Sequence, residues 1–238
     1  MSKEKLLEDL KEKSEKIGIN LKQIDLEKFY DYMNLLLEWN EKINLTAITE
    51  PKEIILKHFI DSLSIEKYIK DGNKLIDVGT GAGFPGIPLN IARNDIKITL
   101  LDSLNKRVVF LEDVINKLEL KNINAIHSRV EEYAKNKNYR ESYDIATSRA
   151  VAPLNVLLEY LLPLVKINGI CICMKGPNKE EIDLANNALK TLGGKIEQID
   201  EILLPDSDIK RNIIIVRKIN KTPEKYPRKV GMPSKEPL

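Results

Sequence analysis

Apolar residues recur at helical spacing through the first third of the chain. The segment from 26 to 37 places one apolar stripe along a helix, and its members are Leu26, Phe29, Tyr30, Met33, Leu36 and Leu37. Leu6, Leu10 and Ile17 indicate an earlier helix. The run PKEIILKHFIDSL, residues 51–63, indicates a later one, with a proline in the first turn, where its missing N–H is not needed. We therefore expect residues 1–72 to form an N-terminal helical region.

From Lys74 the pattern changes to short β-rich runs that alternate with helical segments. In chain order the runs read KLIDV, KITLLD, INAIH, YDIATS, GICICMK and NIIIVRK. Strands separated by helices form a parallel sheet that is covered on both faces. We therefore predict a doubly wound α/β domain over residues 73–218, whose ligands bind beyond the carboxyl ends of the strands. Residues 219–238 contain four prolines and no periodicity, which indicates an extended tail.

The charge is distributed unevenly along the 238 residues. The net charge is only +2, and residues 1–72 carry 12 basic and 15 acidic side chains. Residues 210–238 carry 9 basic and 2 acidic side chains, so the basic charge gathers at the C-terminal end. A basic tail favours an anionic partner, nucleic acid above all, although a solvated terminus explains it equally well.

Cysteine and histidine give no sign of a metal or redox site. Cys171 and Cys173 lie two residues apart in a predicted buried strand, where a bridge between them would be strained. We interpret them as buried thiols in a reducing compartment. His58 and His127 stand apart in the sequence and are expected to be structural, so no metal is predicted. The N-terminus lacks a signal-peptide apolar stretch and no 18-residue apolar run occurs, so we expect a cytoplasmic protein without membrane contact.

The stretch LIDVGTGAGFPGIPL, residues 75–89, joins the first predicted strand to the first helix of the α/β region. It contains four glycines, which allow a sharp turn and a close approach of the backbone to a ligand: Gly79, Gly81, Gly83 and Gly86. Two acids flank them in neighbouring elements. Asp77 lies near the end of the first strand, and Asp102 ends the next one.

Two interpretations of this loop compete. GAGFPG satisfies G-x-G-x-x-G, and Asp102 follows Gly81 by 21 residues, which is typical of a nicotinamide-dependent oxidoreductase. However, the strand ends near Val78, so the turn begins at Gly79, and the carboxylate of Asp77 would oppose a pyrophosphate. That carboxylate suits a cationic ligand, one with an ammonium or a sulfonium group. A purely structural role for both acids, as a helix cap or in an ion pair, stays open.

The pattern D-x-G-x-G-x-G, from Asp77 to Gly83, resembles motif I of the class I S-adenosylmethionine-dependent methyltransferases. By that resemblance Asp102 accepts hydrogen bonds from both ribose hydroxyls, since a carboxylate offers two acceptor oxygens. Adenine contacts would follow the third strand, in SRVEE. There, Ser128 and Glu131 also fit a helix cap and a first-turn acid.

The predicted methyl acceptor is narrowed by motifs that the chain lacks. After the fourth strand it reads TSRAVAPL and not the N-P-P-[YF] pattern of adenine amino methylation. Both cysteines lie within a strand, which disfavours the thiol nucleophile of pyrimidine C5 methylation. An acceptor with a free lone pair, such as guanine N7, needs alignment and no general base, and alignment alone can offset roughly 7–11 kcal/mol of barrier. O-methylation with a weak base stays open.

Segments spread over nearly the whole chain resemble the GidB/RsmG family of bacterial rRNA methyltransferases. They are WNEKINLTAIT, HFIDSL, LIDVGTGAGFPGIPL, LLDSLNKRVVFLEDV, TSRAVAPL, MKGP and YPRKVGMPSKEPL. The resemblance implies a Rossmann-like seven-stranded methyltransferase sheet, S-adenosylmethionine as cofactor, and formation of 7-methylguanosine in 16S rRNA of the small ribosomal subunit. It places cofactor contacts at Gly79, Phe84, Val130, Glu131 and Arg149. The family usually has alanine where Val130 stands.

Several cations are candidates for contact with RNA. Arg149 follows the fourth strand, Lys175 follows the fifth, and Lys106 and Arg107 open a helix after the second. The candidates near the C-terminus are Arg211, Lys225, Arg228 and Lys229, each of which could hold a phosphate. For about half of these cations a solvated charge is the better interpretation. Arg149 and Lys175 are candidates for positioning the acceptor, no catalytic base is predicted, and a monomer is expected. A non-catalytic RNA-binding protein on this fold is the remaining alternative.

Overall fold

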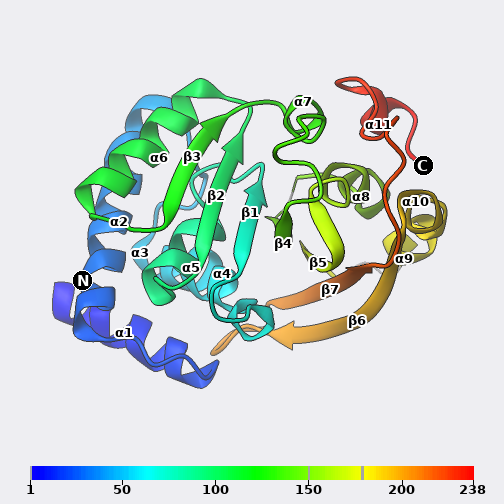
Figure 1. Cartoon of the computed structure of the whole chain (residues 1–238). Helices are drawn as coiled ribbons and strands as arrows, with labels where there is room; N and C mark the ends of the chain where they lie inside the picture. Colours follow the sequence, from blue (N-terminus) through cyan, green and yellow to red (C-terminus); the bar gives the residue numbers. More distant parts are fainter. Residues whose placement is uncertain (1, 150, 178–179) are drawn as a thin grey trace.

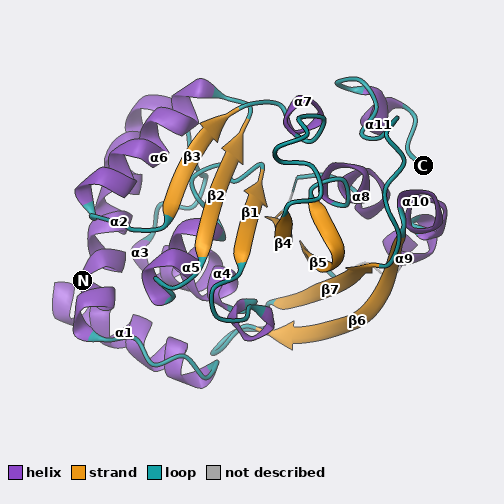
Figure 2. Cartoon of the chain, viewed as in Figure 1, coloured by secondary structure: helices purple, strands orange, loops and turns teal. Residues whose placement is uncertain are grey.

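One mixed sheet of seven strands organises the chain (Figures 1 and 2). The computed structural model describes residues 2–149, 151–177 and 180–238. The strands are β1 (Lys74–Val78), β2 (Lys97–Asp102), β3 (Ile123–His127), β4 (Tyr143–Arg149), β5 (Val165–Lys175), β6 (Gly194–Leu203) and β7 (Lys210–Lys218). The helices are α1 (Lys3–Lys16), α2 (Gln23–Ile43), α3 (Pro51–Ile54), the π-helix η1 (Ile55–Ile60), α4 (Asp61–Leu63), the 3₁₀ helix η2 (Glu66–Tyr68), α5 (Gly86–Ala92), α6 (Asn105–Lys117), α7 (Val130–Tyr133), α8 (Leu154–Leu161), α9 (Glu180–Leu184), α10 (Asn186–Leu192) and α11 (Met232–Lys235).

The strand order is β3-β2-β1-β4-β5-β7-β6. The first five strands are parallel, and β7 and β6 continue the sheet in antiparallel pairing. The chain moves outward from β1 to β3 and then crosses back to β4, so the order reverses between β1 and β4. Ligands of open α/β sheets bind outside the carboxyl ends of the strands at such a reversal. The predicted α/β class is confirmed, whereas β6 and the antiparallel pairing of β7 were not predicted from the six β-rich runs.

Helices cover both faces of this sheet (Figure 2). Successive strand residues point to opposite faces, so Leu75 packs with α5, α6 and the N-terminal helices, while Ile76 packs with α8 and α10. Cys171 and Cys173 are fully buried in β5 and are free thiols, as expected from the sequence. Each face of the sheet therefore has its own apolar core, and the two cores meet only through the strands.

The N-terminal helices pack directly onto the first of these cores. The buried stripe of α2 consists of Leu26, Phe29, Tyr32, Met33 and Leu36. It differs from the predicted stripe, because Tyr32 is fully buried while Tyr30 and Leu37 are only half-buried. At the far end of α2, Trp39 Nε1 donates to Asp113 Oδ2 of α6 at 2.8 Å. Residues 51–63, predicted as one helix, form α3, η1 and α4 without a break.

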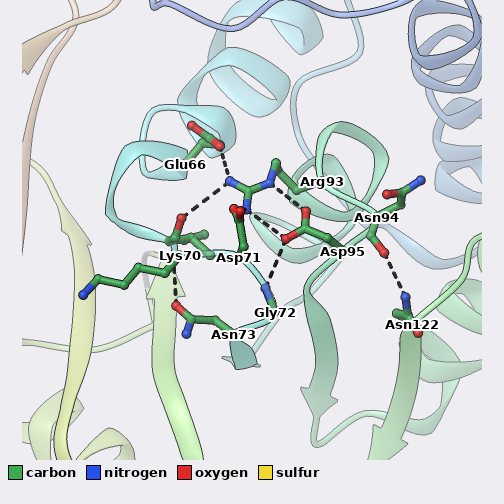
Figure 3. Close-up of polar contacts among 10 residues, drawn as sticks. Glu66, Lys70, Asp71, Gly72, Asn73, Arg93, Asn94, Asp95 and Asn122 are labelled. Carbon is green, nitrogen blue, oxygen red and sulfur yellow. Dashed lines mark hydrogen bonds and ion pairs between the residues drawn. The ribbon is translucent and has the colours of Figure 1, made fainter.

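A charged cluster ties the N-terminal region to the amino ends of the strands (Figure 3). The guanidinium of Arg93, at the end of α5, pairs with Glu66, Asp71 and Asp95. Asp95 also accepts from the N–H of Gly72 at 3.2 Å. This cluster lies at the opposite end of the strands from the glycine loop, so it fixes the helical region and leaves the ligand edge free.

The C-terminal tail, residues 219–238, runs back over the sheet domain and ends in the short helix α11 (Figure 1). Arg140, which precedes β4, donates to the carbonyls of Thr222 and Tyr226 at 2.8 and 2.7 Å. Tyr226 joins the core of the α8 face. The tail was predicted to be extended, and it is held against the body by these contacts and by its own buried side chains.

Candidate active site

The loop between β1 and α5 follows a path that favours glycine. Gly79, Gly81 and Gly83 have φ angles of +67°, +61° and +98°, in the left-handed region. A Cβ at Gly79 would lie 2.7 Å from Cγ2 of Val151, and one at Gly83 would lie 2.5 Å from Cδ1 of Ile87. The backbone therefore turns sharply past the end of β1, and at Gly79 and Gly83 the surrounding side chains leave no room for a Cβ.

Asp77 lies beneath this loop and is fully buried. Its Oδ2 accepts from the N–H of Gly86 at 2.9 Å and from the hydroxyl of Thr80 at 2.6 Å. These bonds close the loop and cap the start of α5. Its Oδ1 is buried without a hydrogen-bond partner among the described residues. Burial raises the pKa of this carboxyl to about 6, so its ionised form is poorly compensated.

Asp102 ends β2, beside β1 in the sheet. Its carboxylate is nearly fully buried and accepts one backbone hydrogen bond at each oxygen. Oδ2 accepts from the N–H of Gly81, and Oδ1 from the N–H of Leu104, both at 2.9 Å. Arg107 approaches Oδ2 at 3.5 Å. Oδ2 thus has two donors, whereas Oδ1 has a second lone pair, so Asp102 keeps acceptor capacity for a ligand at Oδ1.

A cavity of about 180 Å³ opens beside the loop at the carboxyl edge of the sheet. It brings together three residues that the resemblance places at the cofactor: Gly79, Val130 and Glu131. Its other lining residues are Val78, Leu101, Ser103, Ser128, Arg129, Val151, Ala152, Tyr160 and Ser234. Tyr160 and Ser234 were not predicted at the site, although Ser234 lies in the segment YPRKVGMPSKEPL, because α8 and α11 reach this cavity only through the fold.

Arg149, at the end of β4, is held by several acceptors. Its Nη1 donates to the carbonyl of Lys57 at 2.9 Å and to Asp61 Oδ2 at 3.0 Å. Its Nη2 lies 3.1 Å from Nδ1 of His58. Its guanidinium carbon stands 4.9 Å from the ring centre of Phe84, which is a cation–π contact. Arg149 and Phe84, both predicted at the cofactor, therefore touch each other at the β1–β4 reversal.

His58 is part of this arrangement, although the sequence predicted an isolated histidine. Its ring stacks on Phe84 with centroids 4.4 Å apart. Burial, together with the charge of Arg149, lowers the pKa of His58 to about 3, so the imidazole is neutral. Because a guanidinium only donates, Nδ1 is the acceptor and Nε2 carries the hydrogen, which it donates to Thr46 Oγ1 at 2.9 Å. Both ring nitrogens are thus engaged, and His58 is not free to take a proton.

A second cavity, of about 340 Å³, lies against Arg149 and is lined by cations. It brings together three predicted RNA-contacting residues, Arg149, Lys175 and Arg211. Asp61 bridges two of them, because Arg211 Nε donates to its Oδ1 at 3.0 Å while Arg149 holds its Oδ2. Lys175 is also paired, with Glu181 Oε2 at 2.9 Å. These three cations are therefore held in place by Asp61 and Glu181, neither of which was predicted at the site.

The other predicted RNA contacts lie apart from this cavity. Lys106 is exposed at the start of α6, and Lys225 and Lys229 are exposed on the tail. Arg228 is different, because its guanidinium is bound to the fully buried carboxylate of Glu159, with Nη2 to Oε2 at 2.6 Å. Among residues 2–149, 151–177 and 180–238, no group of three or more histidine, cysteine or acidic side chains is arranged to hold a metal ion.

Comparisons with known proteins agree with one another. The family model for GidB, described as rRNA small subunit methyltransferase G, matches residues 25–213. A curated protein of that name from Acetivibrio thermocellus is 57% identical over 222 residues, which is 93% of this chain and 92% of the relative. Another, from Alkaliphilus metalliredigens, is 51% identical over 232 residues, 96% of this chain and 97% of the relative.

Solved structures from other organisms have a similar fold. A SAM-dependent methyltransferase from Aquifex aeolicus aligns with a TM-score of 0.52 at 21% identity, covering 70% of this chain and 93% of that one. TYW2 from M. jannaschii in complex with AdoMet aligns with a TM-score of 0.52 at 12% identity, covering 67% of this chain and 77% of that one. At such identities the likeness concerns the fold alone.

Proposed function

This chain belongs to the rRNA small subunit methyltransferase G family, and we propose that it transfers the methyl group of S-adenosylmethionine to N7 of a guanine in 16S rRNA. The observation that carries the proposal is the glycine loop held between two buried acids, Asp77 and Asp102, beside the cavity of about 180 Å³. The dinucleotide alternative fits this geometry poorly, because a pyrophosphate at the loop would lie near the buried, unpaired carboxylate oxygen of Asp77.

The residues of the loop fit a cationic nucleoside cofactor. Gly79 leaves its backbone bare at the cavity, where a Cβ would meet Val151. The unpaired Oδ1 of Asp77 is a buried acceptor that an ammonium or sulfonium group would compensate. We place the ribose hydroxyls at Asp102 and the adenine at Val130 and Glu131, which line the cavity.

Arg149 lines the cavity of about 340 Å³ and contacts Phe84 of the glycine loop, and we propose that methyl transfer occurs beside this pair. S-adenosylmethionine supplies an electrophilic methyl group on a sulfonium. The acceptor guanine is assigned to the cavity of about 340 Å³, where Arg149, Lys175 and Arg211 balance the charge of its phosphates. N7 offers a lone pair and has no proton to remove, so the engaged, neutral His58 is consistent with a reaction that needs no base.

We also propose a partner, an oligomeric state and a cellular location for the protein. No helix of the described residues is long and apolar enough to cross a bilayer. We propose that it acts as a monomer on the small subunit or its 16S rRNA. We place this activity in the cytoplasm, together with the rRNA.

Methyl transfer can be tested with small subunits from cells that lack this protein. Incubation with the purified protein and S-adenosylmethionine should produce 7-methylguanosine in 16S rRNA, detected by mass spectrometry of nuclease digests. Asp102→Ala should abolish the product, because the ribose acceptor is lost. RNA binding without any methylated product would instead favour a non-catalytic RNA-binding protein.

A further inference from the structure

The motif YPRKVGMPSKEPL, residues 226–238, contributes Ser234 to the lining of the cavity of about 180 Å³, but the role of the segment as a whole has not been described. Its first part is anchored to the body. The buried Glu159 of α8 accepts from the backbone N–H of Arg228 at 2.8 Å and from its guanidinium. Thr222, upstream, is buried and donates its hydroxyl hydrogen to the carbonyl of Leu192 at 2.8 Å. The tail therefore arrives at Arg228 in a fixed place.

Beyond Arg228 the tail reaches the cavity of about 180 Å³. In Figure 1, α11 lies near α7 and α8, on the side toward which the arrows of β1, β2 and β3 point. The N–H of Gly231 donates to Glu131 Oε1 at 3.3 Å. The hydroxyls of Ser234 and Tyr160 are 3.3 Å apart, and both residues line the cavity together with Glu131 and Gly79. The carbonyl of Leu238 accepts from Asn155 Nδ2 at 3.3 Å, which holds the end of the chain on α8.

We propose that residues 229–238 form one wall of the S-adenosylmethionine pocket, at its adenine end, and so act in cofactor binding; this rests on the proposed function. Gly231 positions Glu131, and Ser234 presents a hydroxyl to the cavity. Because two hydroxyls that share one hydrogen bond use only one of their two hydrogens, the Tyr160–Ser234 pair keeps a donor for a ring nitrogen of the base.

The wall can be tested in the full chain by adding bulk at neighbouring positions. Both positions are exposed, but Ser234→Trp places an indole at the cavity, whereas Lys235→Trp places the same group one residue further on α11, at a position that does not line it. Binding of S-adenosylhomocysteine is measured by calorimetric titration, and thermal unfolding without ligand verifies that both variants fold. We expect Ser234→Trp to raise Kd at least tenfold and Lys235→Trp to change it less than twofold.

A second pair of variants removes the hydroxyls without adding bulk. Tyr160→Phe combined with Ser234→Ala should raise Kd about threefold to tenfold, because the donor to the base is lost. If the wild-type protein binds S-adenosylhomocysteine and all these variants bind it equally well, the tail is not a wall of the pocket. If the wild-type protein does not bind S-adenosylhomocysteine, the proposed function itself fails.

Discussion

At the scale of single residues, Asp77 carries the most informative chemistry. Its carboxyl has a pKa of about 6 because it is buried, well above the ordinary value. A cationic cofactor favours the ionised form, so binding lowers this pKa and releases a proton. Affinity is therefore weaker below pH 6, where the carboxyl is protonated, and levels off above pH 7.

We expect the affinity for S-adenosylmethionine to rise about tenfold from pH 5 to pH 7, which follows from the change in the ionised fraction of a group with that pKa. Calorimetric titrations across this range measure the change. Asp77→Asn should bind weakly and show little dependence on pH. Asp102→Asn, the matched control, should bind weakly at every pH and keep the dependence. A wild-type profile that is flat would contradict the role of Asp77.

Gly79 and Gly81 permit a comparison of two neighbouring glycines with similar φ angles. Alanine at either position takes on left-handed strain of about 1–2 kcal/mol, so both variants should lose similar stability in urea unfolding. At Gly79 the new Cβ meets Val151, which lines the cavity, whereas at Gly81 it would lie 4.0 Å from the carbonyl oxygen of Gly79, an ordinary contact. Gly79→Ala should therefore weaken S-adenosylhomocysteine binding at least tenfold more than Gly81→Ala.

Adding Val151→Ala to Gly79→Ala tests the cause directly. Removal of the valine methyls should restore most of the lost affinity but none of the stability lost to the backbone strain. Equal affinities of the Gly79→Ala and Gly81→Ala variants would show that the contact with Val151 does not matter. Gly79→Asp, with a larger and charged side chain, should abolish binding.

At the scale of elements, Asp61 joins three parts of the structure. It begins α4, and its two oxygens bind Arg149 from β4 and Arg211 from β7. Asp61→Asn leaves two guanidinium groups facing a neutral amide. Loss of one partner from a buried ion pair costs about 3–5 kcal/mol, and the partial exposure of both arginines reduces the expected loss of stability to about 2 kcal/mol.

Urea unfolding measures this loss. Asp206→Asn, in an exposed pair with Lys16, is the matched control and should leave the midpoint nearly unchanged. Its φ of +56° is one that asparagine tolerates, so the exchange adds no backbone strain. If the two variants unfold at the same urea concentration, the bridge made by Asp61 contributes little.

The tail allows a similar test with two adjacent cations. Lys229 is exposed, so Lys229→Ala should leave the free energy of unfolding unchanged. Because we expect Lys229 to hold a phosphate, the same variant should reduce the slope of log K against log salt concentration for rRNA binding by about 0.7–0.9. Arg228→Ala should instead lower stability, because Glu159 is left buried without its cation, and should leave the salt slope unchanged. If the salt slope of rRNA binding falls for Arg228→Ala and not for Lys229→Ala, then Arg228 is the phosphate contact and Lys229 is not.

The elements differ in how far the sequence could predict them. β1, β2, β4 and β5 are interior strands with apolar runs, and the edge strand β3 was visible as the β-rich run INAIH. β6, at the other edge, is mostly exposed, and the apolar residues of GKIEQIDEIL are separated by charged and polar ones up to its last two positions. Four of the six residues of the predicted α2 stripe are buried, but Tyr32 was missed, since it is buried by Phe59 and Phe84, which come from distant parts of the chain.

At the scale of the whole molecule, residues of the site also divide into those visible in a local sequence motif and those that depend on distant parts of the chain. The glycine loop and its two acids are local motifs at strand ends, so spacing alone located them. His58, Asp61, Tyr160 and Ser234 come from a helical region, from α8 and from the tail, and they join the two cavities only when the sheet brings these parts together. The division into a helical region, a sheet domain and a tail stays a prediction.

Trp39 offers a way to test whether the helical region unfolds separately. It is the single tryptophan of the chain, and its ring contacts Phe110 of α6 while its N–H binds Asp113. Its fluorescence therefore reports on the contact between α2 and the sheet domain, whereas far-UV circular dichroism reports on all helices and strands.

We expect both signals to change at the same urea concentration, because residues of α1, α2, the sheet and α6 share one apolar core. S-adenosylhomocysteine should raise both midpoints together, since it stabilises the whole folded unit. Arg93→Ala, which breaks the cluster of Figure 3, should lower both midpoints without separating them, because the apolar core remains. A fluorescence transition that precedes the loss of circular dichroism would show that the N-terminal helices form a separate unit, and then ligand binding should shift only the later transition.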